Sequence, residues 1–430
     1  MKSLATAFTL LLVATPAFAD SVTYKGTIGK LPIVLELSKE PGRGVTDIFG
    51  RYFYADKGID IPLHMEAGRG GLNLVEELPC KEDTKNCPNA QDDTPSNPPL
   101  GAKWALEVTK RGAALEGKWT DNGRSQTVTL EKVGTRPFEP SDPASPGNLT
   151  DFAAALIYSD DVLTPETSPY DYLKVSGALK ETDPETLSGS TFRYVSDPRT
   201  IFQFPRIVKA GDTDLTAAND YLQQRHWTFS LDALWCEAQI YQGFGWNGYN
   251  YDAGTLGWWD EETVAVSYLS PTLLSWTEAG SLSCGGAHPY NHYEFHNLDV
   301  KTGTPIDLSM IFKGWVAKDF DGKLADIVDA RTHPRDFQWG PDEELAKFVK
   351  AHRQTDAELG LEPDSECGID ELIDSNLAVG FKDGDKVLFT LGDLPNVIQA
   401  CSSDLYEAPI AELKDLLASG AADYFPSLKS

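Results

Sequence analysis

The most informative stretch of this chain runs from Cys284 to Phe312 and reads CGGAHPYNHYEFHNLDVKTGTPIDLSMIF. We expect a strand to end near Cys284 and the chain to kink at Gly285-Gly286, where a residue with a Cβ would be strained. A second strand is predicted from Tyr290 to Val300, followed by a turn at Lys301-Thr302-Gly303. Asp307 has the position of a cap that begins a short helix.

This order of features resembles the extracellular domain of the RsiV-like family, which includes a lysozyme-sensing anti-sigma factor and the accessory region of a peptidoglycan deacetylase. The shared motif residues are Gly285, Gly286, His288 and Pro289. The resemblance is close over about residues 264–418 and loose over about 190–263. It implies an α+β domain with an antiparallel sheet and a few helices, and a lysozyme-type partner. The chain shows neither a transmembrane helix nor a cytoplasmic sigma-binding segment, so signalling by regulated cleavage is not implied.

The first nineteen residues have the pattern of a secretory signal peptide. Lys2 precedes an apolar run from Leu4 to Ala14, and Ala17-Phe18-Ala19 provides the small residues of a cleavage site. No cysteine follows the run, which disfavours a lipid anchor, and no later apolar run is long enough to span a membrane. We therefore expect a soluble periplasmic or secreted protein that begins at Asp20.

The length and charge of the chain limit its architecture and partners. The roughly 410 residues after the signal exceed one hydrophobic core, so two or three domains are expected. The formal charge of −28 repels nucleic acids and anionic membranes. It favours encounter with a basic protein, or it serves solubility alone.

Six cysteines in an exported chain predict disulfides, for which fifteen connectivities are possible. None of them lies in a Cys-x-x-Cys redox motif. Because cysteines of one domain pair with each other, we favour the sequential pairs Cys80 with Cys87, Cys236 with Cys284, and Cys367 with Cys401.

Residues 20–133 alternate between apolar and polar side chains, as strands with one buried face do. About eight strands joined by turns such as Asn122-Gly123 predict an antiparallel barrel or meander. Its interior either holds a ligand or is filled by its own side chains. The polar segment from Pro79 to Leu100 is expected to be an exposed loop.

The remainder of the chain mixes strands and helices. We predict a Pro-rich linker at 134–148, an α+β region at 149–263, a C-terminal domain at 264–420 and a tail at 421–430. Helices are expected from Thr213 or Asp214 toward Gln224, at 324–330, at 343–351 and at 409–417, and a hairpin is expected around Asp383-Gly384.

A glycine-rich segment between Tyr241 and Trp259 carries many aromatic side chains, namely Phe244, Trp246, Tyr249, Tyr251, Trp258 and Trp259. These rings either form an exposed platform for a glycan or a protein partner, or fold back onto the domain.

His288, His292 and His296 are spaced four residues apart, which on a helix would align them for a metal. On the predicted strand four residues span about 13 Å, too far for one ion. A weak surface site at His292, Glu294 and His296 remains open, but we predict no metal and no cofactor. The sequence contains no nucleophile elbow, P-loop or dinucleotide fingerprint and singles out no acid–base pair.

The sequence thus predicts an exported, non-catalytic binding protein of the cell envelope, whose partner is a lysozyme-type basic protein. The alternative is a peptidoglycan-binding accessory module or a cell-wall hydrolase that uses the aromatic segment. No nucleic-acid partner and no membrane insertion are expected.

Overall fold

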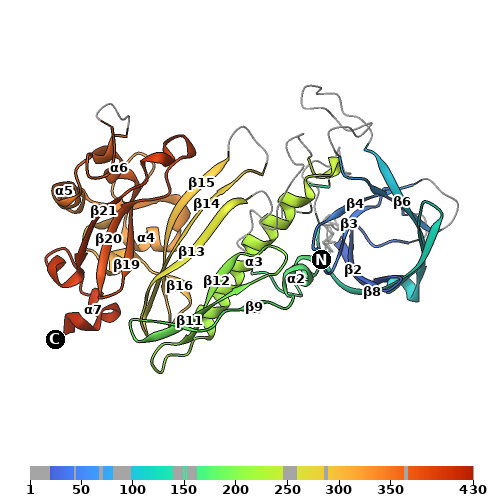
Figure 1. The fold of residues 1–430 in the computed structure, drawn as a ribbon, viewed down its shortest axis with the longest axis horizontal. Coiled ribbons are helices and arrows are strands. Elements are labelled where there is room, and N and C mark those ends of the chain that lie inside the picture. Colours follow the sequence, from blue (N-terminus) through green and yellow to red (C-terminus); the bar gives the residue numbers. More distant parts are fainter. Residues whose placement is uncertain are drawn as a thin grey trace, which may run out of the picture. The chain divides into compact units, whose positions relative to one another are not determined.

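The computed structural model describes residues 20–42, 45–66, 71–80, 98–138, 149–150, 152, 162–245, 259–284, 289–362 and 367–429. The chain forms two compact units that divide near Leu173. The first contains the predicted barrel, and the second contains several sheets and helices (Figure 1). The α+β fold class is therefore confirmed.

The first unit is a closed antiparallel barrel of eight strands. Each strand pairs with its neighbours in sequence, and β1 pairs with β8 to close the barrel. The strands are β1 (Asp20–Ile28), β2 (Leu31–Leu37), β3 (Phe49–Tyr54), β4 (Ile61–Met65), β5 (Leu72–Glu77), β6 (Leu100–Thr109), β7 (Ala114–Asp121) and β8 (Arg124–Pro137).

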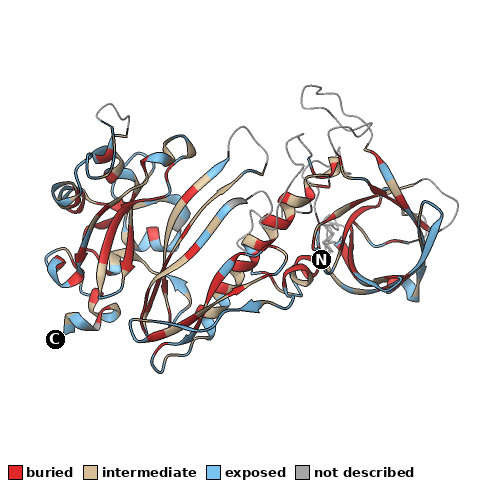
Figure 2. Ribbon diagram, in the orientation of Figure 1, coloured by how far each residue is buried: buried red, intermediate tan, exposed pale blue. Residues whose placement is uncertain are grey.

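The interior of the barrel is filled by side chains from all eight strands, among them Tyr24, Leu35, Leu63 and Trp104. Figure 2 shows buried positions along the barrel strands. This follows from the alternation in the sequence, since every second residue of a strand points inward. The β7–β8 turn has positive φ at both Asn122 and Gly123, as the sequence predicted. The described interior is thus a packed core.

Helix α2 (Pro169–Val175) provides packing on the outer face of the barrel, where Tyr170 contacts Val34 and Phe53. Strand β8 also extends to Pro137, so the first part of the predicted linker is paired with β1. The prediction that the second region begins at residue 149 was wrong, because residues up to Leu173 belong with the barrel.

The second unit begins with a small sheet and a long helix. The sheet contains β9 (Lys180–Glu181), β10 (Glu185–Leu187), β11 (Ser190–Ser196) and β12 (Gln203–Lys209). Helix α3 (Thr216–Ala238) continues well beyond the predicted end at Gln224. Asp214 accepts a hydrogen bond from the Thr216 amide, as expected of a residue near a helix start.

A second sheet contains β13 (Trp259–Leu269), β14 (Leu273–Leu282), β15 (Tyr290–Asp299) and β16 (Thr304–Pro305). The predicted strand after the glycine pair is therefore confirmed from Tyr290 onward. Gly303 adopts a φ of 67° in the predicted turn, and Asp307 caps the following 3₁₀ helix at Leu308–Met310. Side chains of β12, α3, β13, β14 and β15 share one core.

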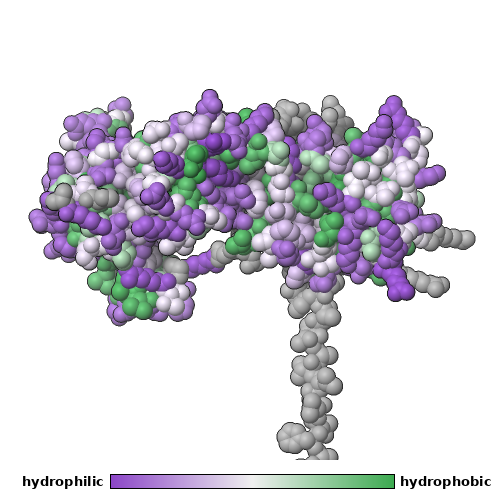
Figure 3. All heavy atoms as spheres, turned by 90° about the horizontal axis from the view of Figure 1, so that it is seen from below, coloured by the Kyte–Doolittle hydropathy of each residue, from purple (hydrophilic) through white to green (hydrophobic). Residues whose placement is uncertain are grey.

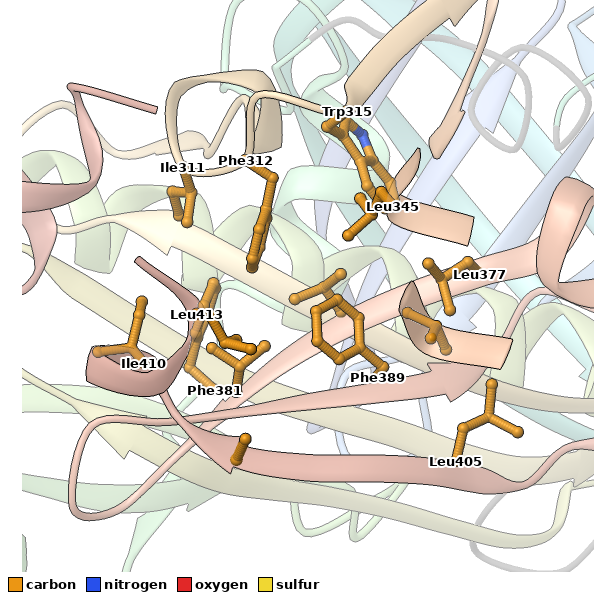
Figure 4. Close-up of a cluster of buried hydrophobic side chains, with 14 of the residues drawn as sticks. Ile311, Phe312, Trp315, Leu345, Leu377, Phe381, Phe389, Leu405, Ile410 and Leu413 are labelled. Carbon is orange, nitrogen blue, oxygen red and sulfur yellow. The ribbon is translucent and has the colours of Figure 1, made fainter. Parts of the chain in front are cut away.

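The C-terminal part packs three more groups of elements around a third core (Figure 4). These are the hairpin β17 (Trp315–Lys318) and β18 (Gln338–Pro341), the helices α4 (Ile327–Thr332), α5 (Glu343–His352) and α6 (Ile369–Asn376), and the sheet β19 (Leu377–Lys382), β20 (Lys386–Leu391) and β21 (Asp404–Pro409). Phe312, Phe381 and Phe389 lie within this core. The predicted hairpin at Asp383-Gly384 and the helix at 343–351 are confirmed.

Two predictions near the C-terminus were wrong. Residues 409–417 do not form an α-helix, because 404–409 pair with β20 and Ile410–Leu413 form a 3₁₀ helix. The predicted tail instead forms α7 (Ala421–Tyr424), and Phe425 is fully buried against Tyr268 and Phe381. The buried side chains of Ala421 and Phe425 tie this terminal segment to the core.

Two of the predicted disulfides are present, Cys236–Cys284 and Cys367–Cys401. Cys87 lies outside the described residues. Within the described part of the chain, none of the helices combines the length and the apolar character needed to cross a membrane.

Candidate functional site

A group of charged side chains lies on the face of the β13–β15 sheet that packs against α3. We call it the charged layer; its members are Arg225 of α3, Glu262 of β13, Glu278 of β14, and His292, Glu294 and His296 of β15. The strand register explains the grouping, because it pairs Glu278 with Glu294 and places Gly280 opposite both Glu262 and His292.

The opposite face of β15 has a different role. Tyr293 donates a hydrogen bond to Asp404, and Asn297 donates one to the Val379 carbonyl, so these alternate residues face the β19–β21 sheet. The β13–β16 sheet is therefore covered on both sides, and the charged layer lies inside the second unit.

Glu278 and Arg225 are the central pair of the layer. The Glu278 side chain is fully buried, and its two oxygens each lie 2.5 Å from a guanidinium nitrogen of Arg225. The indole nitrogen of Trp276 donates a third hydrogen bond at 2.8 Å. Burial raises the pKa of Glu278, but hydrogen bonds from His296 and Arg225 outweigh burial and bring it to about 2. The group is therefore an anion throughout the physiological range.

His296 lies between Glu278 and Glu294, with its Nε2 3.3 Å from an oxygen of each. Its ring stacks on Trp276 with centroids 5.1 Å apart. Burial lowers the pKa of His296, but the two carboxylates raise it by more, so the net shift is upward. The two carboxylates thus favour the protonated, imidazolium form of His296.

Glu278, Glu294 and His296 each offer one ligand atom, and these atoms lie within 4.8 Å of one another. The position that a metal would take is occupied by the Nη2 of Arg225. This nitrogen is 2.5 Å from Glu278, 3.0 Å from His296 and 3.5 Å from Glu294. The guanidinium is thus the cation beside the two carboxylates, and a metal bound at these three residues would have to displace it.

A second pair in the layer joins Glu262 and His292, with Oε2 and Nε2 2.9 Å apart and both side chains buried. Burial raises the pKa of Glu262, while the Glu262 carboxylate raises that of His292 against the effect of burial. Both shifts favour the protonated form of the group concerned. Gly280 makes room for the Glu262–His292 pair, since a Cβ at this position would lie 2.2 Å from a Glu262 oxygen.

The layer is electrically balanced when both imidazoles are protonated, with three carboxylates and three cations. Such balance is what a buried ion network requires, because an unpaired charge away from water is costly. Each carboxylate of the layer already has a cation beside it. The arrangement is therefore suited to holding α3 on the sheet.

The aromatic segment is described only in part. Phe244 is buried against Trp235 and Tyr241, so this ring is not part of an exposed platform. Trp246, Tyr249, Tyr251 and Trp258, and the side chain of Trp259, lie outside the described residues, as do Gly285, Gly286 and His288. Pro289 is exposed and directly precedes β15.

The barrel contains a buried carboxyl that the sequence did not suggest. Glu76 accepts hydrogen bonds on one oxygen from Tyr52, Trp104 and Trp119, at 2.8, 2.8 and 2.6 Å. Burial raises its pKa despite these donors. The three donors satisfy the carboxyl within the core.

On the outer face of the barrel, Glu36 is fully buried and binds Arg51 and Arg136. Although burial raises the pKa of Glu36, the guanidinium groups of Arg136 and Arg51 lower it to about 2. Asp171 of α2 binds the other side of Arg51 at 2.9 Å and so holds the helix on the barrel.

Sequence reasoning missed Arg225, Glu262 and Glu278. Their partners are distant in the sequence: Arg225 and Glu278 are 53 residues apart. One signal was present, because Glu278 shares a strand face with Trp276, and a carboxylate beside a large buried ring requires a partner. The prediction that β15 spreads its histidines along an extended strand is confirmed for His292 and His296, which enter two different pairs.

Searches against protein-family models and against curated proteins gave no match for this chain. The resemblance to the RsiV-like family therefore stays a prediction.

Proposed function

We propose that this chain is an exported envelope protein that binds a basic protein, with a lysozyme-type enzyme as the expected partner. The observation that carries the proposal is where the negative charge lies. Residues 319–374 contain sixteen Asp and Glu but six Lys and Arg, a net charge of −10 out of −28 for the whole chain. About an eighth of the sequence thus holds more than a third of the excess charge.

Many of these carboxylates are exposed, including Asp321, Asp329, Glu343, Asp356 and Asp374. The charged layer differs, since the side chains of Glu262 and Glu278 are fully buried there. Figure 3 shows hydrophilic side chains over most of the face it presents, with hydrophobic ones in small groups. The unbalanced charge is therefore available to a partner.

A concentrated negative field accelerates encounter with a positive protein by about 10- to 1,000-fold at low ionic strength. The effect weakens when the Debye length falls to about 8 Å at physiological salt. The field suits capture of a basic enzyme, and the resemblance to the RsiV-like family points to the lysozyme type.

The test is titration calorimetry of the protein from Asp20 onward against a c-type lysozyme at low and moderate salt. We expect saturable binding that weakens as salt rises. Lysozyme whose lysines have been succinylated is the matched control, because its fold is kept and its charge is reversed. Absence of heat with unmodified lysozyme at low salt would contradict the proposal, as would equal binding of the succinylated form.

A further inference from the structure

Three large apolar side chains point into solvent within nine residues of the second unit. Phe320 is 73% exposed, Leu324 is 64% exposed and Val328 is 66% exposed. Single exposed apolar residues are common, whereas exposed apolar side chains that lie together mark binding surfaces.

The backbone holds these side chains in a fixed arrangement. After β17 the chain continues as a ladder, in which the Asp319 amide donates to the Lys323 carbonyl at 2.9 Å and Lys318 forms a bridge with Leu324. The Asp319 carboxylate accepts from the amides of Asp321 and Lys323, and so closes the turn that presents Phe320.

Helix α4 follows directly and carries the third side chain. Its cap, Asp326, accepts from the amides of Val328 and Asp329 at 2.9 and 3.2 Å. Other residues of β17 and α4 already pack inward, since Trp315, Ala317 and Ala330 are buried. The three exposed side chains therefore take no part in the core, and little ordering entropy remains to be lost on binding.

The charge around this group is negative. Asp321, Asp326 and Asp329 are exposed beside it. The nearby Arg331 is bound to Asp307 at 2.6 Å, which neutralises one of the few cations in the segment. The β17–β18 hairpin that bears the group also contacts α4, α5 and α6, and of these helices α6 carries three carboxylates and no Lys or Arg.

We propose that Phe320, Leu324 and Val328 form the apolar centre of the surface that docks a basic, folded protein, with the surrounding carboxylates as its rim. This inference rests on the proposed function and specifies where the partner binds. An apolar centre with a charged rim is the usual anatomy of a protein interface, and here the rim fits a positively charged partner.

The experiment compares the variant Phe320→Ser/Leu324→Ser with the control Val397→Ser, which alters an equally apolar side chain that is 86% exposed in another part of the unit. Both are titrated with a c-type lysozyme and, separately, with oligolysine, which offers charge without a folded surface. Because all three positions are exposed, unfolding midpoints should match that of the unmodified protein.

We expect the double variant to lose about tenfold or more in affinity for lysozyme and to bind oligolysine as before. The control should keep both affinities. If the double variant binds lysozyme as tightly as the control does, the proposal for the docking surface is wrong, while the proposed function still holds. If the unmodified protein does not bind lysozyme at all, both are wrong.

Discussion

Replacing Arg225 with methionine tests the structural role assigned to the charged layer. Methionine keeps an apolar side chain of similar length but removes the guanidinium, whose carbon lies 5.7 Å from the centroid of the Phe229 ring. Glu278, whose side chain is fully buried, then loses both of its 2.5 Å contacts with Arg225. Its remaining partners are Trp276 and His296.

The expected cost follows from these contacts. Breaking a buried ion pair by removing one partner destabilises a protein by about 3–5 kcal/mol. His296 lies 3.3 Å from the same carboxylate and compensates in part, so we expect about 3 kcal/mol. Changing Glu278 to glutamine in the same protein removes the orphaned charge and should restore more than half of the loss.

Native-state hydrogen exchange of peptides from β14 and β15 is the appropriate assay, because it measures local opening free energies in a chain of two units. The matched control is Arg353→Met, whose partners Asp356 and Asp370 are more than half exposed, and which should cost less than about 1 kcal/mol. A loss for Arg225→Met no larger than that of the control would refute the reasoning. So would additive losses in the double variant.

Three further predictions concern the second unit. The pKa values of His292 and His296 are raised in the fold, so their contribution to stability is complete below their unfolded pKa near about 6.5 and is lost as pH rises through the folded values. Denaturation curves from pH 6 to 9 should show that the free energy of unfolding falls as pH rises, and His292→Gln/His296→Gln should reduce this dependence on pH. The same dependence in the variant would contradict the stabilising role of the two imidazoles. Gly280→Ala should destabilise the sheet by about 2 kcal/mol, because the new Cβ lies 2.4 Å from the Glu261 carbonyl, whereas Gly340→Ala has no atom within 4 Å and should be neutral; equal midpoints for the two would contradict this. Cys367→Ser/Cys401→Ser removes a disulfide that closes a loop of 34 residues and should cost about 4 kcal/mol in thermal or urea unfolding under oxidising conditions; an unchanged midpoint would contradict this.

Much of the fold was predictable because it depends on local sequence patterns, such as the alternation of apolar and polar residues and the positions of turn residues. Alternation along β1 to β8 gave the barrel, and Asn122-Gly123 gave one of its turns. The glycine turn at Gly303 and the cap at Asp307 have local causes as well. Cysteine order predicted two disulfides correctly, since each bridge closes within one unit.

The errors arose where distant segments determine the local structure. Helix α3 was predicted to run toward Gln224, but it continues to Ala238. This extension begins with two polar residues, Arg225 and His226, and His226 is fully buried where α3 packs against both sheets, so the polar–apolar pattern does not mark this part of the helix. Likewise, β21 pairs with β20 as far as Pro409, and the segment that follows forms only the short 3₁₀ helix Ile410–Leu413 in place of the predicted longer helix.

In the candidate site, too, the features with a local cause were predictable and the contacts between distant segments were not. The sequence placed His292 and His296 correctly on an extended strand, but it could not reveal Arg225 or Glu262 as their neighbours. Pairing across 53 residues depends on how the helix crosses the sheet. The exposure of Phe320, Leu324 and Val328 was equally hidden, because an apolar side chain in a sequence is expected to be buried.

The most direct test of partner binding is a hydrogen-exchange footprint of the protein with and without a c-type lysozyme at low salt. We predict new protection in residues 319–374, centred on the segment from Phe320 to Val328, and unchanged exchange in the barrel strands. Protection confined to the barrel, or to residues 241–259, would contradict the account.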